Sequence, residues 1–254
     1  MILTASLWLG LQMLFSSVTA FPDTAGPAEK GRLIYQNRFA GQQDVKNWVM
    51  EGPGELKFKD GWMEMYSPGK KWDHVFWCPE YFPGSFTAKW EMQNLDTSAG
   101  LVIIFFSANG DKGQDIFDPG LPKRDGTFKY YNRGQINEYH ISYYSNNPKD
   151  PDRSSTNLRK DPQFALLQTG PAGIPAASIA VHRIRLVKAG SRIILYADER
   201  KVIDYTDDGK TYGRAYAGGR IGFRQMRWTH FRYRNFRVWR NTETIQGESV
   251  KKKK

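Results

Sequence analysis

Residues 86–92 read Phe-Thr-Ala-Lys-Trp-Glu-Met, and this stretch decides the fold class. Its apolar side chains occupy every second position: Phe86, Ala88, Trp90 and Met92. Successive side chains of an extended strand point to opposite faces, so this period of two predicts a β-strand with one buried face.

The segments around this stretch follow the same pattern. Residues 56–59 and 62–66 flank Asp60-Gly61, a two-residue signal for a tight hairpin. Residues 101–106 are continuously apolar, which predicts a strand covered on both faces. Further strands are predicted at 183–187, 192–197, 202–205, 220–226 and 231–239. No window holds a helical period over more than two turns. The chain is therefore predicted to be all-β, a jelly-roll sandwich of two antiparallel sheets forming one domain over residues 21–245.

Both ends of the chain differ from this domain. Residues 1–20 are predicted to be an export signal: an apolar run from Ile2 to Phe15 precedes small residues at Val18 and Ala20. An uncleaved membrane anchor is the alternative, although the run is shorter than the roughly 20 residues that a span needs. We expect a periplasmic or secreted protein without membrane insertion after cleavage. Residues 246–254 are predicted to be a disordered basic tail.

The charge of the chain indicates which class of binding partner to expect. The 254 residues carry a net charge of +11, of which Lys251–Lys254 supply four. The remaining excess favours an anionic partner. In an exported protein without a nucleic-acid-binding motif, that partner is expected to be an acidic polysaccharide and not nucleic acid. The single cysteine, Cys78, excludes an intramolecular disulfide and is interpreted as a buried strand residue.

Residues 137–144, Asn-Glu-Tyr-His-Ile-Ser-Tyr-Tyr, carry the strongest functional signal. As a strand, they would place Tyr139, Ile141 and Tyr143 in the core. The opposite face would carry an acid, an imidazole, a hydroxyl and a phenol: Glu138, His140, Ser142 and Tyr144. Two long irregular segments, 109–135 and 145–178, flank this strand and are expected to wall a groove across its polar face.

The closing run, residues 218–226 and 233–238, resembles the last strands of concanavalin-A-like lectin/glucanase domains. Residues 75–80, 115–118, 137–144 and 157–160 are more specifically similar to the YesU-like family of that superfamily. The resemblance implies a two-sheet jelly roll whose concave face binds carbohydrate, and an association with bacterial breakdown of pectin or another polysaccharide. It implies no particular reaction, because that family is itself of unknown function.

The chemistry of the polar residues favours some reactions over others. The Glu-x-Asp-x-x-Glu spacing of a retaining glucanase is absent from the sequence. A polysaccharide lyase needs groups that neutralise a uronate and groups that move protons. The chain offers Arg159, Lys160, Arg224 and Gln225 for the first role, and His140, Glu138 and Tyr144 as catalytic candidates. Asn157 and Ser142 are further candidates for substrate binding.

Structural interpretations stand beside these. His140 is equally explained as a buried, hydrogen-bonded residue, and Glu138 as an ion-pair partner of Arg159 or Arg224. Since Arg224 and Gln225 are adjacent, they cannot share a face without a bulge.

The aromatic side chains Trp72, Trp77 and Tyr81 are candidate platforms for sugar rings. Core packing is the alternative for Trp77, and Trp72 is the better platform candidate. Three loop carboxylates, Asp111, Asp115 and Asp118, offer oxygens that Ca²⁺ prefers. Their spacing matches no defined calcium loop and acidic loop residues are usually turn formers, so no cofactor is predicted and Ca²⁺ at these carboxylates stays the alternative.

The sequence thus predicts an exported protein that acts on an oligo- or polysaccharide, expected to be acidic and of plant or algal cell-wall type, by hydrolysis or elimination. A non-catalytic lectin-like module is the first alternative. An inert structural sandwich is the second.

Overall fold

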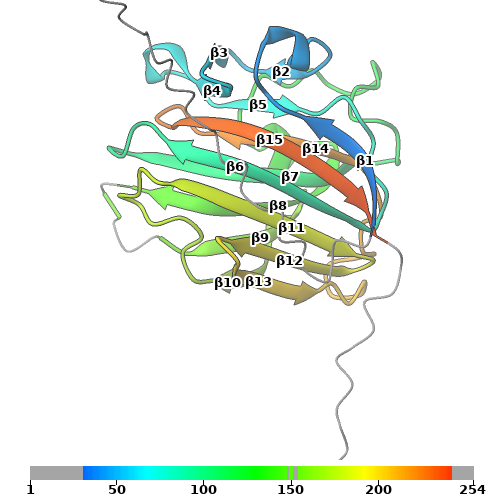
Figure 1. Cartoon of the computed structure of the whole chain (residues 1–254). Coiled ribbons are helices and arrows are strands. Elements are labelled where there is room, and N and C mark those ends of the chain that lie inside the picture. The colour runs from blue at the N-terminus through cyan, green and yellow to red at the C-terminus, as the bar shows by residue number, and fades with distance from the viewer. Residues whose placement is uncertain (1–30, 148, 151–153, 242–254) are drawn as a thin grey trace, which may run out of the picture.

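Two antiparallel sheets packed face to face make up the fold (Figure 1). The computed structural model describes residues 31–147, 149–150 and 154–241. The predicted export signal and basic tail lie outside these described residues. Within them, the all-β jelly-roll prediction is confirmed.

The first sheet has β6 and β15 at its centre. One further strand, β1 (Arg32–Asn37), also pairs with β15 and is not part of the linear strand order. Its order is β13 (Arg200–Thr206), β12 (Arg192–Ala197), β11 (Val181–Ala189), β6 (Phe86–Asn94), β15 (His230–Arg240), β4 (Trp62–Tyr66) and β3 (Glu55–Lys59).

The second sheet places β8, the polar strand of the sequence, next to β7. Its order is β10 (Ala165–Gly170), β9 (Thr156–Asp161), β8 (Ile136–Asn146), β7 (Gly100–Gly110), β14 (Arg220–Gln225), β5 (His74–Trp77) and β2 (Val49–Glu51). The described helical segments are short: η2 (Gln42–Val45), η3 (Pro68–Lys70) and α1 (Lys129–Asn132).

The main core lies between the sheets and follows the predicted alternation. All four apolar residues of 86–92 are buried there. From β7, Val102, Ile104 and Phe106 join the same core, whereas Ile103 and Phe105 enter a second apolar cluster. The prediction of a strand covered on both faces is therefore confirmed. Cys78 is buried as predicted, and burial raises the pKa of its thiol to about 12, which disfavours a nucleophilic role.

The tight hairpin predicted at Asp60-Gly61 is confirmed. Asp60 and Gly61 have φ values of 53° and 75°, as a type I′ hairpin turn requires.

The interpretation of 145–178 as one irregular segment is wrong, because β9 and β10 form a hairpin within it. β9 carries a single apolar side chain, Leu158, so no alternation of apolar residues marks it as a strand.

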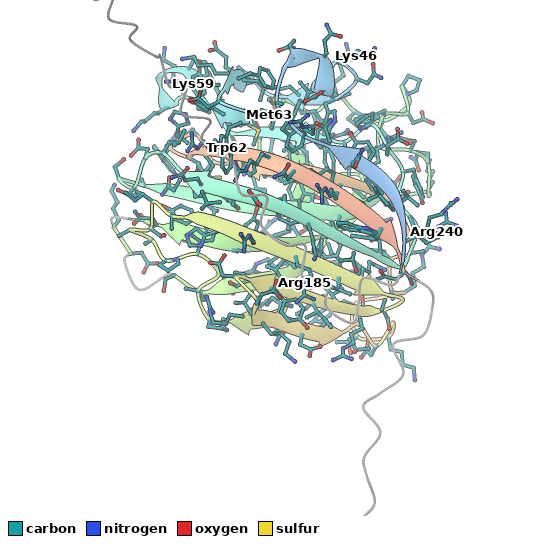
Figure 2. All side chains as sticks on the ribbon, viewed as in Figure 1. Lys46, Lys59, Trp62, Met63, Arg185 and Arg240 are labelled. Carbon is teal, nitrogen blue, oxygen red and sulfur yellow. The ribbon has the colours of Figure 1, made fainter. Side chains whose placement is uncertain are left out.

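The outer face of the first sheet is covered by arginine stems on aromatic rings. Arg232 and Arg234 lie over the ring of Trp62, at 4.6 and 4.1 Å from its centroid. Arg185 lies 3.7 Å over Tyr196. Figure 2 shows Trp62 and Arg185 on this face. Among the described residues, no helix is long and apolar enough to cross a membrane.

Candidate functional site

The polar face of β8 forms cross-strand pairs with β9 on the outer side of the second sheet. Glu138 is opposite Asp161, His140 is opposite Arg159, and Ser142 is opposite Asn157. The intervening Tyr139, Ile141 and Tyr143 are buried in the core between the sheets, as predicted. Three of the four residues of the predicted polar row therefore share one face.

Tyr144 does not lie on that face, so this part of the prediction is wrong. The register of β7 against β8 moves from Ile103 opposite Ser142 to Val102 opposite Tyr144, which leaves Tyr143 as an extra residue. Such a β-bulge shifts the following side chain to the other face. Tyr144 consequently enters the main core, where its hydroxyl accepts a hydrogen bond from Asn94 Nδ2 at 2.9 Å and donates to the carbonyl of Ala176.

A covering segment, residues 111–135 including α1, lies over the outer face of the second sheet instead of walling an open groove. Its Ile116 and Tyr131 pack with Trp77 and Phe105 in the second apolar cluster. Trp77 is fully buried, and its indole N–H donates to Glu51 Oε2 at 2.9 Å. Trp77 therefore packs in a core and offers no exposed surface to a sugar.

A buried ion pair fixes this covering segment. Arg124 Nη2 lies 2.5 Å from Glu51 Oε1, and both side chains are nearly inaccessible to solvent. The hydroxyl of Tyr131 donates to Glu51 Oε2 at 2.7 Å. Burial, followed by the charge of Glu51, raises the pKa of Tyr131. Removing either charge alone would leave the other buried without its partner, so the covering segment needs both charges to keep this position.

Glu138 is the most unusual group on this face. It is completely buried, and neither carboxyl oxygen has a hydrogen-bond partner among the described residues. Burial first, and then the neighbouring Asp161 carboxylate, raise the pKa of Glu138 well above its ordinary value. The side chain is thus a candidate proton donor held in a buried site.

His140 is buried beside it and forms a pair with a carboxylate. Its Nδ1 is hydrogen-bonded to Asp161 Oδ2, and its ring packs against three phenylalanines from different segments: Phe105, Phe128 and Phe164. The structure therefore agrees with the interpretation of His140 as a buried, hydrogen-bonded residue.

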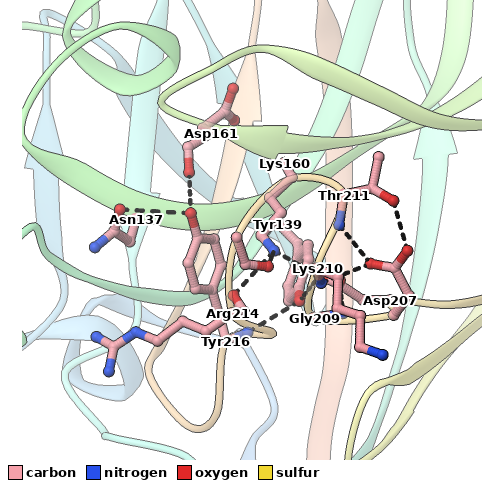
Figure 3. Close-up of polar contacts among 12 residues, drawn as sticks. Asn137, Tyr139, Lys160, Asp161, Asp207, Gly209, Lys210, Thr211, Arg214 and Tyr216 are labelled. Atoms are coloured by element: carbon pink, nitrogen blue, oxygen red, sulfur yellow. Dashed lines mark hydrogen bonds and ion pairs between the residues drawn. The ribbon is translucent and has the colours of Figure 1, made fainter.

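Lys160 points away from this face into the end of the sandwich. Its ammonium lies 2.8 Å from Asp207 Oδ2 and donates to the carbonyls of Gly213 and Arg214 (Figure 3). Tyr139 donates to the same Asp207 carboxylate. Because these contacts engage the buried ammonium, Lys160 has a structural role here and does not face a ligand.

The other predicted binding residues are divided between the two faces. Arg224 lies on the outer side, where its guanidinium stacks over Phe128 at 4.5 Å and binds Asp73. Gln225 faces inward and is hydrogen-bonded to Tyr233. The alternation expected for these adjacent residues is confirmed.

Two residues of β9 remain half-buried on the outer side. Arg159 Nη1 donates to the carbonyl of Phe164 at 3.0 Å, and its guanidinium lies over that ring. Asn157 Oδ1 accepts a hydrogen bond from Thr169.

A groove of about 580 Å³ opens beyond the covered part of the sheet, at the end of β8. Trp228, which is 39% exposed, forms one wall with Arg227, whose guanidinium lies 4.4 Å over the indole ring. The remaining lining residues are Ala99, Gly100, Leu101, Ser145, Asn146, Asn147, Lys149 and Met226. Sequence reasoning missed this groove because its residues come from three separate segments of the chain.

Trp72 belongs to a neighbouring segment and is 59% exposed, in keeping with its prediction as an accessible platform. Its neighbour Asp73 accepts a hydrogen bond from the backbone N–H of Arg227 at 3.0 Å. The segments that carry the exposed Trp72 and Trp228 are therefore tied to each other.

The loop carboxylates considered as calcium ligands have other partners. Asp115 forms an ion pair with Arg220 at 2.5 Å, and Asp118 accepts the N–H of Gly120. Among the described residues, no group of three or more His, Cys, Asp or Glu side chains could hold a metal ion.

Comparisons with known proteins agree with this fold. Residues 32–238 match the family described as a domain of unknown function, DUF1961. The chain is 35% identical over 213 residues to the uncharacterized protein YesU of Bacillus subtilis strain 168, covering 83% of this chain and 96% of YesU.

Two solved structures illustrate the architecture. A Bacillus subtilis protein of unknown function with a galectin-like fold superposes with a TM-score of 0.80, at 34% identity over 84% of this chain and 98% of that one. The Emp46p carbohydrate recognition domain in its potassium-bound form gives a TM-score of 0.53 at 14% identity, covering 79% and 92% of the two chains. The second likeness concerns the fold alone. On the extent of the sequence match, the chain belongs to the DUF1961 family, and it is similar to YesU over most of its length.

Proposed function

We propose that this protein binds a carbohydrate in the groove at the end of β8, as a lectin-like module. The observation that carries the proposal is the exposed indole of Trp228 in a groove of about 580 Å³, within the size range of small-molecule sites. A flat aromatic ring matches the apolar C–H face of a pyranose. The side-chain amides of Asn146 and Asn147, which line the same groove, can donate to and accept from sugar hydroxyls.

The charges of the groove favour an acidic sugar. Lys149 and Arg227 line it, and none of the described lining residues is acidic. A uronate carboxylate would form charge-assisted hydrogen bonds with either cation. The net positive charge of the chain acts in the same direction over a longer range.

The fold adds support of a general kind. The Emp46p domain named above is a carbohydrate recognition domain on a similar sandwich. Fold alone does not fix function, so the proposal depends on the groove.

Calorimetric titration with a panel of oligosaccharides tests this function. The panel contains oligogalacturonates, oligoalginates and neutral cello-oligosaccharides. We expect binding of an acidic member, and a loss of about fivefold or more in affinity for Trp228→Ala, since stacking on an aromatic ring contributes on the order of 1 kcal/mol or more.

The matched control is Tyr81→Ala. Tyr81 is 55% exposed and lines a second groove of about 530 Å³ near β1. Equal losses in both variants, or no binding to any member of the panel, would contradict the proposal.

A second candidate function, cleavage of the glycan, is favoured by one observation: the buried Glu138 beside the Asp161 carboxyl. A carboxylic acid whose pKa is raised by burial can donate a proton to a leaving oxygen. The covering segment would have to open before a substrate could reach Glu138. Incubation with the same panel, followed by reducing-end and ultraviolet assays, separates hydrolysis from elimination. Product formed by the wild type and abolished in Glu138→Gln, with groove binding retained, would establish this function.

A further inference from the structure

Three side chains far from the groove form a continuous hydrogen-bonded chain of hydroxyl, imidazole and carboxylate. Ser178 Oγ lies 2.7 Å from His182 Nε2, and His182 Nδ1 lies 2.5 Å from Asp198 Oδ2. Ser178 precedes β11, His182 is its second residue, and Asp198 follows β12. We propose that Ser178, His182 and Asp198 form a second functional site that hydrolyses carboxylic esters by acyl transfer to Ser178.

The hydrogen-bond chemistry orients each proton for this reaction. An ionised carboxylate can only accept, so Nδ1 of His182 must donate to Asp198. In the neutral imidazole, Nε2 is then the acceptor, and the hydroxyl of Ser178 donates to it. This arrangement has the roles of nucleophile, general base and orienting carboxylate that define a serine triad independently of fold.

The backbone holds the carboxylate rigidly. The second oxygen of Asp198 accepts the N–H of Arg183 at 2.8 Å, and the N–H of Asp198 donates to the carbonyl of Arg183 at 2.9 Å. Both bonds join the β12–β13 turn to the start of β11. Asp198 is thus fixed at two points although its side chain is 49% exposed.

In this triad the base, His182, is buried, whereas the nucleophile, Ser178, is accessible to solvent. The His182 ring is only 7% exposed, which shields its hydrogen bonds from water. Ser178 is half-buried in a turn whose next residue, Ile179, is 68% exposed. A substrate can therefore reach the hydroxyl from solvent while the base stays protected.

A comparison within the molecule separates this triad from ordinary histidine pairs. Among the described residues, His140 pairs with Asp161 and His230 with Glu64, and neither imidazole has a hydroxyl on its other nitrogen. His182 is the one described histidine bonded to both a carboxylate and a serine.

The proposed ester hydrolysis consumes only the ester and one water molecule. Ser178 Oγ forms a bond to the ester carbonyl carbon as its proton passes to His182 Nε2. The backbone N–H of Ile179, which donates to no other described residue, is the candidate to stabilise the oxyanion.

Collapse of this intermediate breaks the ester C–O bond, and His182 returns the proton to the departing alcohol. Water then attacks the acyl-serine with the same base, and releases the carboxylic acid. The exposed Ile179 side chain offers an apolar contact to a short acyl group, so esters of short-chain acids are the expected substrates.

Labelling with an alkyl fluorophosphonate tests the proposal on the full chain. Peptide mass spectrometry is expected to find the phosphonyl adduct on Ser178, with the label lost in Ser178→Ala. Asp198→Asn should slow the labelling and the hydrolysis of p-nitrophenyl acetate by a factor on the order of 10² to 10⁴. Asp198 is half-exposed, so this variant is expected to fold, and circular dichroism verifies that it does.

Ser98→Ala is the matched control. The Ser98 hydroxyl donates to the carboxylate of Asp96 at 2.5 Å without an intervening imidazole. This variant should be labelled and should hydrolyse the ester like the wild type. Absence of an adduct on Ser178, equal labelling of Ser98, or wild-type rates in Asp198→Asn would overturn the assignment.

Discussion

The replacement Glu138→Gln should stabilise the protein, and should do so more strongly as the pH rises. Glu138 is fully buried with unpartnered oxygens, and burial raises its pKa in the folded state. The folded protein therefore keeps a proton that the unfolded chain releases above its ordinary pKa of about 4.5. The stabilising contribution of this proton is complete below that value and is lost as the pH rises toward the folded-state pKa.

The magnitude follows from one proton. Between the ordinary pKa and the raised pKa, each pH unit lowers the free energy of unfolding of the wild type by about 1.4 kcal/mol. Glutamine has nearly the same shape and no charge, so the variant does not contribute this slope. Domains are stable by only about 5–15 kcal/mol, so the change in the free energy of unfolding over one pH unit is large enough to measure.

Urea unfolding followed by tryptophan fluorescence from pH 4.5 to 7.5 provides the assay. The difference between Glu138→Gln and the wild type should widen with pH. The exposed Glu80 provides the control Glu80→Gln, for which the difference should stay within about 0.5 kcal/mol. In an Asp161→Asn background the slope should persist over a shorter range, because burial is the larger cause and the Asp161 carboxylate the smaller one. A difference that is independent of pH, or a wild type that gains on the variant as pH rises, would refute a buried, protonated Glu138.

Three further changes test the packing around the site. Lys160→Met should lower the free energy of unfolding by about 3–5 kcal/mol by leaving Asp207 buried and unpaired, and adding Asp207→Asn should restore part of it in urea titrations. Gly222→Ala should cost about 1–3 kcal/mol in the same assay, because a β-carbon at 222 would lie 2.4 Å from the Trp77 ring. Tyr144→Phe should cost about 1–2 kcal/mol through its two lost hydrogen bonds, whereas its calorimetric affinity for the groove ligand should stay within twofold of wild type.

The strands could be predicted from the sequence because their signals are local. The alternation in 86–92 and the Asp60-Gly61 turn each specify a structure through neighbouring residues. The bulge at Tyr143 has no such signal, since no glycine or proline marks it and either tyrosine suits a core. One inserted residue was enough to remove Tyr144 from the predicted catalytic row.

The position of the covering segment could not be predicted from local sequence patterns, for a different reason. Its anchor joins Glu51 to Arg124, which are 73 residues apart, and the value of that contact depends on burial that the sequence does not display. Lys160 was misassigned in the same way, because its partner Asp207 comes from another part of the chain. Arg159 and Lys160 are adjacent in β9, so their side chains point to opposite faces and cannot both meet one ligand.

The covering segment and the bulge together divide the polar face of β8 into two parts with different requirements. Glu138 and His140 lie beneath buried side chains, so any chemistry there requires the Glu51–Arg124 pair to separate or the segment to shift around it. Ser142 remains half-buried, and beyond it Ser145 and Asn146 line the groove without any such barrier. A ligand held by Trp228 would therefore contact this strand at its far end and leave the proton of Glu138 undisturbed. Binding in the groove leaves the covering segment in place, whereas cleavage at the buried Glu138 requires that segment to move, and this difference is the physical reason to place binding first.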